Sequence, residues 1–202
     1  EGMLDIAVPG DIFAAPGPEA CLEALRLADK GKGVVLVVFN HPGDILTADK
    51  AIELAEQEGI RVVKILSTDD VFSAPSSKME QRRGLVGGIV LIKLIASAAR
   101  EGYSLSELTQ MAQGFLQNVA TLAVATRGAT HPMTGQLIAG IEEGQMAIGI
   151  GQHGEHGVPC VPLLSADEAA DYISEMLITD LHLCAGDRVM VIINELGATT
   201  LM

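Results

Sequence analysis

Val34-Val35-Leu36-Val37-Val38-Phe39 is an unbroken apolar run that contains four valines. It lies between the turn-forming Gly31-Lys32-Gly33 and the polar segment Asn40-His41-Pro42-Gly43-Asp44. A short β-branched run without polar alternation is typical of a strand that is buried on both faces of a parallel sheet. The run therefore predicts a central parallel strand.

The segments on either side of this run have the spacing of helices and of a second strand. Leucines recur at helical intervals in Pro18–Lys30. After the run, Thr47 is expected to cap a helix that continues to Glu58, and Gly59 is expected to end it. Arg61–Leu66 then predicts the next strand. A strand, a helix and a strand of these lengths indicate a βαβ unit with a right-handed crossover.

The rest of the chain also alternates between helical and strand-like patterns. The polar segment Ser67–Ser77 is a candidate domain boundary. Helices are expected at Arg83–Arg100, at Ser106–Val119 and, capped by Ser165, at Ala166–Ile178; strands are expected at Thr121–Val124, Gln145–Ile150 and Arg188–Ile193. The fold class is therefore α/β, with layered domains at residues 1–76 and 77–202 and mixed or parallel sheets.

Composition and charge exclude several classes of protein. The 202 residues include 26 acidic and 13 basic side chains, for a net charge of −13, and no basic cluster favours nucleic acid as a partner. No apolar run approaches the roughly 20 residues that span a bilayer, so no membrane partner is expected. The three cysteines form no CxxC pair, which favours reduced thiols in a cytoplasmic protein.

A glycine-rich segment after one expected strand is the first candidate site. Gly149–Gly157 contains His153, Glu155 and His156 among its glycines, at the end of a strand where open α/β sheets bind ligands. Small glycines let the backbone and an imidazole approach a small ligand closely. A plain turn or a solvated surface loop is the competing interpretation. No metal is expected, because no helix aligns the two histidines and no third ligand is evident.

Two further segments follow strands. Asp44 in Asn40–Asp44 could bind a hydroxyl or act as a general base, or it could cap the helix that follows. Asn194–Thr200 could be a plain exit from the last strand. The sequence has neither a GxxxxGK[ST] loop nor a GxGxxG motif followed by a helix, so it carries no recognised nucleotide site.

Taken together, these segments resemble the dihydroxyacetone-binding subunits, DhaK, of dihydroxyacetone kinases. Gly149–Glu155 is similar to the family motif GxGxHGE, and Asn194–Thr199 is similar to NNLGAT. Asn40–Asp44 resembles NYTGD, and the segments Pro9–Phe13 and Arg82–Gly84 match in the same order.

The resemblance implies a function and two catalytic, substrate-binding residues. His153 would attack the ketone carbon of dihydroxyacetone or a related ketose and hold it as a hemiaminal. Asp44 would be the base on the hydroxyl that is phosphorylated. The chain would bind no cofactor itself, because ADP or ATP with magnesium would be held by a DhaL-type partner subunit or domain. A homodimer is also implied.

Several positions differ from the family pattern and leave an alternative open. The pattern FxSP is here Phe13-Ala14-Ala15-Pro16, the Tyr and Thr of NYTGD are His41 and Pro42, and the Pro of HGEPG is His156. The motif GGGSGHEP would lie before Glu1, so we expect the sequence to be an N-terminally truncated part of a longer protein. The alternative function is a non-catalytic DhaK paralogue that captures a ketone and acts as a regulatory co-activator.

Overall fold

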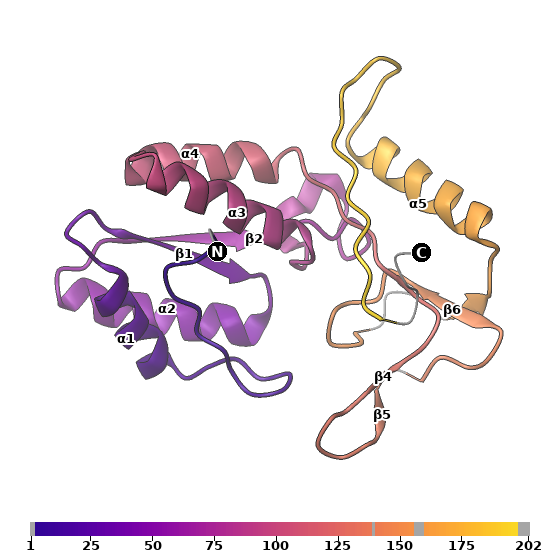
Figure 1. Cartoon of the computed structure of the whole chain (residues 1–202), viewed down its shortest axis with the longest axis horizontal. Coiled ribbons are helices and arrows are strands. Elements are labelled where there is room, and N and C mark those ends of the chain that lie inside the picture. The colour runs from indigo at the N-terminus through magenta and orange to yellow at the C-terminus, as the bar shows by residue number, and fades with distance from the viewer. Residues whose placement is uncertain (1–2, 139, 156–159, 198–202) are drawn as a thin grey trace. The chain divides into compact units, whose positions relative to one another are not determined.

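The computed structural model of the chain describes residues 3–138, 140–155 and 160–197, which form an α/β fold (Figure 1). The chain divides into two units: residues 1–69 with 83–119, and residues 70–82 with 120–202. The first unit contains a parallel sheet and the second contains antiparallel sheets. None of the described helices is long and apolar enough to cross a membrane.

The sheet of the first unit is built from the valine-rich run. Strand β1 (Val34–Phe39) pairs in parallel with β2 (Val62–Ser67), from Val34 opposite Val62 to Phe39 opposite Ser67. Helix α2 (Pro42–Gln57) connects the two strands. The predicted strand–helix–strand unit is therefore confirmed, and so is its parallel pairing.

Helices cover both faces of this sheet, which explains why β1 is apolar throughout (Figure 1). On one face, Val34 and Leu36 pack with α1 (Pro18–Ala28) and α2. On the other, Val35 and Val37 pack with α3 (Gly87–Arg100) and α4 (Leu105–Leu116). Successive side chains of a strand point to opposite faces, so a strand between two helical layers needs no polar residues.

Helix α2 begins earlier than the sequence indicated. His41 is its N-cap residue and Pro42 its first residue, where a proline costs no intrahelical hydrogen bond. The predicted cap at Thr47 is wrong: the Thr47 hydroxyl donates to the carbonyl oxygen of Pro16 at 2.9 Å. Gly59 does follow the helix, with a φ of +79° that favours glycine.

The second unit is centred on strand β6 (Gln145–Ile148), which pairs antiparallel with β3 (Val124–Ala125) and β7 (Val161–Pro162). A short hairpin joins β4 (Ala129–Thr130) to β5 (Leu137–Ile138). The unit also contains a 3₁₀ segment, η1 (Ser76–Gln81), and helix α5 (Ala166–Asp180). Ser165 caps α5 as predicted, in a reciprocal capping box with Glu168.

One predicted strand is not formed. Arg188–Ile193 has strong β propensity, but the structure assigns it no strand, and Val191 and Ile193 are 77% and 84% exposed. β propensity describes how well a residue fits a pleated and half-buried surface, so a strand also needs a partner strand. The prediction considered the residues alone and was wrong for this segment.

Candidate functional site

The glycine-rich candidate loop begins where β6 ends. Gly149 is buried, has a φ of +71° and donates its N–H to the carbonyl oxygen of Ala123 at 2.8 Å. The loop then folds back on itself, because Gly151 N–H donates to the Glu155 carbonyl oxygen at 2.9 Å and Gly154 N–H donates to the Gly151 carbonyl oxygen at 3.0 Å. Gly154 also has a positive φ, +80°. The glycines thus allow a tight loop that a chain of larger residues would strain.

His153 and Glu155 form a pair within this loop. The Nδ1 atom of His153 lies 2.9 Å from Oε1 of Glu155, and the His153 backbone N–H donates to Oε2 at 2.9 Å. Both side chains are about one-third exposed, so they are accessible to a small molecule. The sequence motif contained Glu155, but reasoning from the residues assigned it no role. The geometry assigns it the role of orienting the imidazole.

The environment of Glu155 favours its carboxylate form. Burial opposes ionisation, but hydrogen bonds from backbone N–H groups and from the His153 ring outweigh it and lower the pKa of Glu155. A carboxylate only accepts hydrogen bonds, so the Nδ1 atom of a neutral His153 carries the proton and Nε2 carries the lone pair. A histidine in this tautomer can act as a nucleophile or base through Nε2.

Asp44, the second candidate, lies in the first unit. It is half-buried in the first turn of α2, where a negative charge is favourable to the helix dipole. Burial raises the pKa of the Cys21 thiol, and the negative charge of nearby Asp44 raises it further. The structure thus places Asp44 in a helix and His153 in a loop of the other unit.

The segment before α1 lies against the turn that carries Asp44. A Cβ atom on Gly43 would lie 3.5 Å from the Cβ atom of Ala15, and Thr47 holds the carbonyl oxygen of Pro16. Ala15, one of the altered positions of the FxSP-like segment, is therefore close to the helix turn that carries Asp44.

Sequence reasoning missed a buried carboxylate at the end of β2. Asp69 is fully buried and accepts hydrogen bonds from the Ser67 hydroxyl and from the N–H groups of Leu85 and Gly87, at 2.8–2.9 Å. A Cβ atom on Gly87 would lie 2.6 Å from the Asp69 carboxylate. The glycines after Arg82–Arg83 were the sequence signal that could have indicated this contact, because a backbone that approaches a carboxylate closely requires residues without side chains.

The third candidate segment is Asn194–Thr200, of which the structure describes residues 194–197. Asn194–Gly197 is exposed, and Gly197 N–H donates to the Glu195 carboxylate at 2.8 Å. His156 and Ala198–Thr200, which belong to the quoted motifs, lie outside the described residues.

Known proteins resemble the chain along almost its whole length. The family model described as the Dak1 domain matches residues 1–202. The subunit DhaK of PTS-dependent dihydroxyacetone kinase 2 from Listeria innocua is 39% identical over 198 residues, which is 98% of this chain and 59% of the relative. An L-erythrulose kinase from Pectobacterium atrosepticum is 33% identical over 201 residues, or 98% of this chain and 34% of the relative.

Solved structures of similar proteins also match the fold of the chain. The dihydroxyacetone kinase operon co-activator DhaQ aligns with a TM-score of 0.83 at 30% identity, over 90% of this chain and 55% of that one. The dihydroxyacetone kinase of C. freundii aligns with a TM-score of 0.82 at 29% identity, over 89% of this chain and 33% of that one. The chain spans about three fifths of the length of the curated DhaK relatives. By the family match and the identities to these relatives, the chain belongs to the Dak1 family, that of the dihydroxyacetone-binding subunit DhaK.

Proposed function

We propose that the chain binds dihydroxyacetone or a related short ketose covalently through His153, for phosphorylation by a DhaL-type partner. The pair of His153 and Glu155 is the observation that carries this proposal. It supplies an accessible imidazole whose tautomer is set by a carboxylate, which is what a nitrogen nucleophile needs. Several curated relatives are kinases of dihydroxyacetone or erythrulose, or their binding subunits, which supports the substrate class.

The proposed capture step is an addition to a carbonyl group. The Nε2 lone pair of His153 forms a bond to the ketone carbon, and the π electrons of the C=O bond move to its oxygen. That oxygen takes a proton from water, and the Nδ1 proton passes to the hydroxide that is left, directly or through the Glu155 carboxylate. The product is a neutral hemiaminal, and the water is regenerated. A ketone is distinguished from a polyol by this bond, since hydroxyl contacts alone would accept both.

Asp44 is the base that we propose for the terminal hydroxyl of the ketose. A carboxylate that removes the hydroxyl proton makes the oxygen a better nucleophile toward a phosphoryl group. We propose that the donor, ADP or ATP with magnesium, is held by the DhaL-type partner, and that this chain binds no nucleotide itself. Calorimetry of the chain with ATP and magnesium is expected to show no saturable binding.

The capture step is testable with dihydroxyacetone labelled with ¹³C at the ketone carbon. The carbon resonance is expected to move from the ketone to the hemiaminal region in the wild-type protein and to stay unchanged in His153→Ala. His131→Ala is the matched control, because His131 lies in the same unit but outside the loop, and it is expected to behave as wild type. A labelled carbon that stays a ketone with the wild-type protein would overturn the proposal.

The structural comparisons support a second function equally well. The co-activator DhaQ matches this chain as well as the kinase does, with TM-scores of 0.83 and 0.82. In that alternative, the chain captures a ketone through His153 and signals to a regulator instead of donating the hydroxyl for phosphorylation. Turnover with a DhaL partner distinguishes the two, because a co-activator would form the adduct without yielding a phosphorylated product.

A further inference from the structure

Residues 70–82, here called the strap, run from the end of β2 toward α3 of the first unit but belong to the second unit. At the beginning of the strap, Asp70 forms a parallel bridge with Thr121, and Val71 N–H donates to the Thr121 carbonyl oxygen at 3.1 Å. Thr121 precedes β3, which pairs with β6. The beginning of the strap is therefore fixed to the segment that also supports β6.

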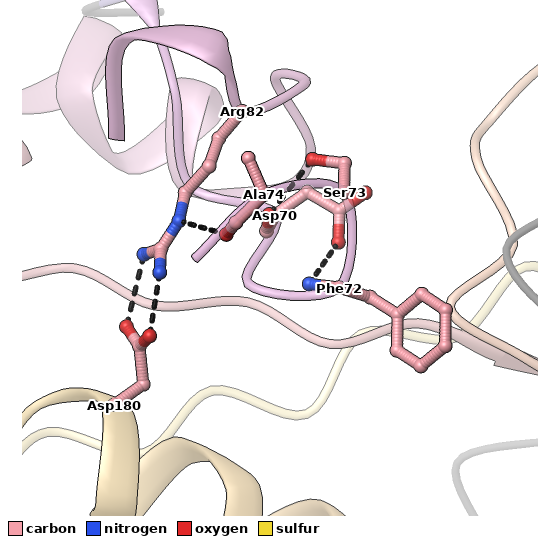
Figure 2. Close-up of polar contacts among 6 residues, drawn as sticks. All are labelled: Asp70, Phe72, Ser73, Ala74, Arg82 and Asp180. Atoms are coloured by element: carbon pink, nitrogen blue, oxygen red, sulfur yellow. Dashed lines mark hydrogen bonds and ion pairs between the residues drawn. The ribbon is translucent and has the colours of Figure 1, made fainter. Parts of the chain in front are cut away.

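The end of the strap is fixed to helix α5. Arg82 is fully buried, and its two Nη atoms donate to the two carboxylate oxygens of Asp180 at 2.9 and 2.5 Å (Figure 2). Its Nε atom donates to the carbonyl oxygen of Ala74 at 2.9 Å, which closes the strap into a loop. Bidentate pairs of an arginine with a carboxylate are strong and geometrically specific. Both ends of the strap are thus held to the second unit.

Between these two ends the strap presents a phenylalanine ring. The Phe72 N–H donates to the Asp70 carboxylate at 3.0 Å, and the Ser73 hydroxyl donates to the Asp70 carbonyl oxygen at 2.9 Å. These bonds fix the backbone on both sides of Phe72, and Figure 2 shows its ring projecting away from Arg82. Asp70 is fully buried, so these hydrogen bonds anchor the turn to the interior of the unit.

The ring of Phe72 packs against the first residue of the loop that carries His153. A Cβ atom on Gly149 would lie 2.0 Å from Cδ1 and Cγ of Phe72, so the ring occupies the space of the missing side chain. Gly149 is the point where the chain leaves β6, and His153 follows four residues later. The position of this ring therefore limits the directions in which the loop can leave the sheet.

We propose that Phe72 is a positioning residue for His153, and that the strap holds it there through Asp70 and through the pair of Arg82 with Asp180. The proposal rests on the proposed function in taking His153 as the nucleophile. Attack on a carbonyl requires an aligned nitrogen, and small displacements of a reacting group are costly in rate. Without the ring, Gly149 would be free to adopt other backbone angles, and His153 would be aligned for only part of the time.

The test compares the Phe72→Ala variant with the wild-type protein. The rate of hemiaminal formation with ¹³C-labelled dihydroxyacetone is expected to fall on the order of 10- to 100-fold. Amide hydrogen exchange at Gly151 and Gly154 is expected to become faster, because both N–H groups close the loop. Phe72→Leu, which keeps apolar bulk over Gly149, is expected to restore most of both properties.

Phe115→Ala is the matched control, since it removes a partly buried phenylalanine from α4 in the other unit. It is expected to lower the melting temperature without changing the loop's exchange or the adduct rate. A folded Phe72→Ala variant with wild-type exchange and adduct rates would sink the proposal.

Two other outcomes are also decisive. If Phe72→Ala does not fold, Gly149→Ala is made both in wild type and in the Phe72→Leu variant. If the ring fills the space beside Gly149, Gly149→Ala should lower the stability less in the Phe72→Leu variant than in wild type. An equal loss of stability in both would contradict the proposal. If wild type forms no adduct, the proposed function fails. Amide exchange then still decides whether Phe72 orders the loop.

Discussion

His153 and Glu155 are only two residues apart, and their pairing makes the loop sensitive to acid. The pKa of Glu155 lies below its ordinary value in the folded protein, so its carboxylate stabilises the fold above the unfolded pKa of about 4.3. That stability is lost as pH falls through the lower, folded pKa. Glu155→Gln keeps the size of the side chain and removes the charge.

We therefore expect Glu155→Gln to unfold at lower urea concentration than wild type at pH 7. The difference in unfolding free energy should shrink as the pH falls below about 5. Urea titrations between pH 7 and pH 3 measure this directly. Glu175→Gln, which removes the charge of an exposed glutamate elsewhere in the same unit, is the control for the loss of one negative charge. A difference that is as large at pH 3 as at pH 7 would contradict the assignment.

Asp44 gives the second residue-scale prediction. Asp44→Asn should leave capture of the labelled ketone unchanged, because capture is assigned to His153. Phosphoryl transfer with a DhaL-type partner should fall by about 10²- to 10⁴-fold, the usual contribution of a general base. Asp49→Asn, on the same helix but exposed and paired with Lys64, should change neither rate. Equal losses of capture and turnover would instead make Asp44 a binding residue.

At the scale of the element, two glycines in helices of the first unit are predicted to respond in opposite directions to the same substitution. Gly87 begins α3, and a Cβ atom there would lie 2.6 Å from the Asp69 carboxylate, so Gly87→Ala should destabilise the protein by about 1–3 kcal/mol. Gly114 lies in α4 with open space around it, so Gly114→Ala should stabilise by up to about 1 kcal/mol. Thermal or urea unfolding of both variants measures the signs, and equal effects would refute the steric explanation.

The elements differ in how far their sequences determine them. The parallel pair β1 and β2 was predictable because two helical layers make its apolar pattern unambiguous. The start of α5 was predictable because Ser165 and Glu168 form a local capping signal. Arg188–Ile193 was not, because a strand depends on a partner that its own residues do not specify.

The residues of the candidate site also differ in whether the sequence could predict them. The motif pointed to His153, since two histidines among glycines after a strand stand out in the sequence. Phe72 could not be found this way, because it is 77 positions before Gly149 in the sequence and only the folded strap brings the two into contact. Contacts between distant segments carry no local pattern in the sequence, and the Phe72–Gly149 contact and the Gly149–Ala123 hydrogen bond are both of this kind.

At the scale of the whole molecule, the exposed apolar run Val189–Ile193 predicts self-association of the 202-residue chain. Its side chains are 51–84% exposed, and contiguous apolar surface of this kind favours contact with another copy. Val191→Lys should reduce association, as measured by light scattering after size-exclusion chromatography. Met133→Lys, which also charges an exposed apolar residue, should not. A wild-type chain that stays monomeric over a wide concentration range would contradict this prediction.

The strap also dictates an order of events during synthesis on the ribosome. Arg82 and Asp180 are 98 residues apart, so Arg82 leaves the ribosome long before Asp180 is made. At about 5–20 residues per second, that delay is roughly 5–20 s. Residues 1–69 and 83–119 of the first unit have all emerged once residue 119 leaves the ribosome, whereas the strap inserted between them must wait for α5. The growing chain therefore passes through a stage in which residues 70–82 lack the anchor that Asp180 gives to Arg82.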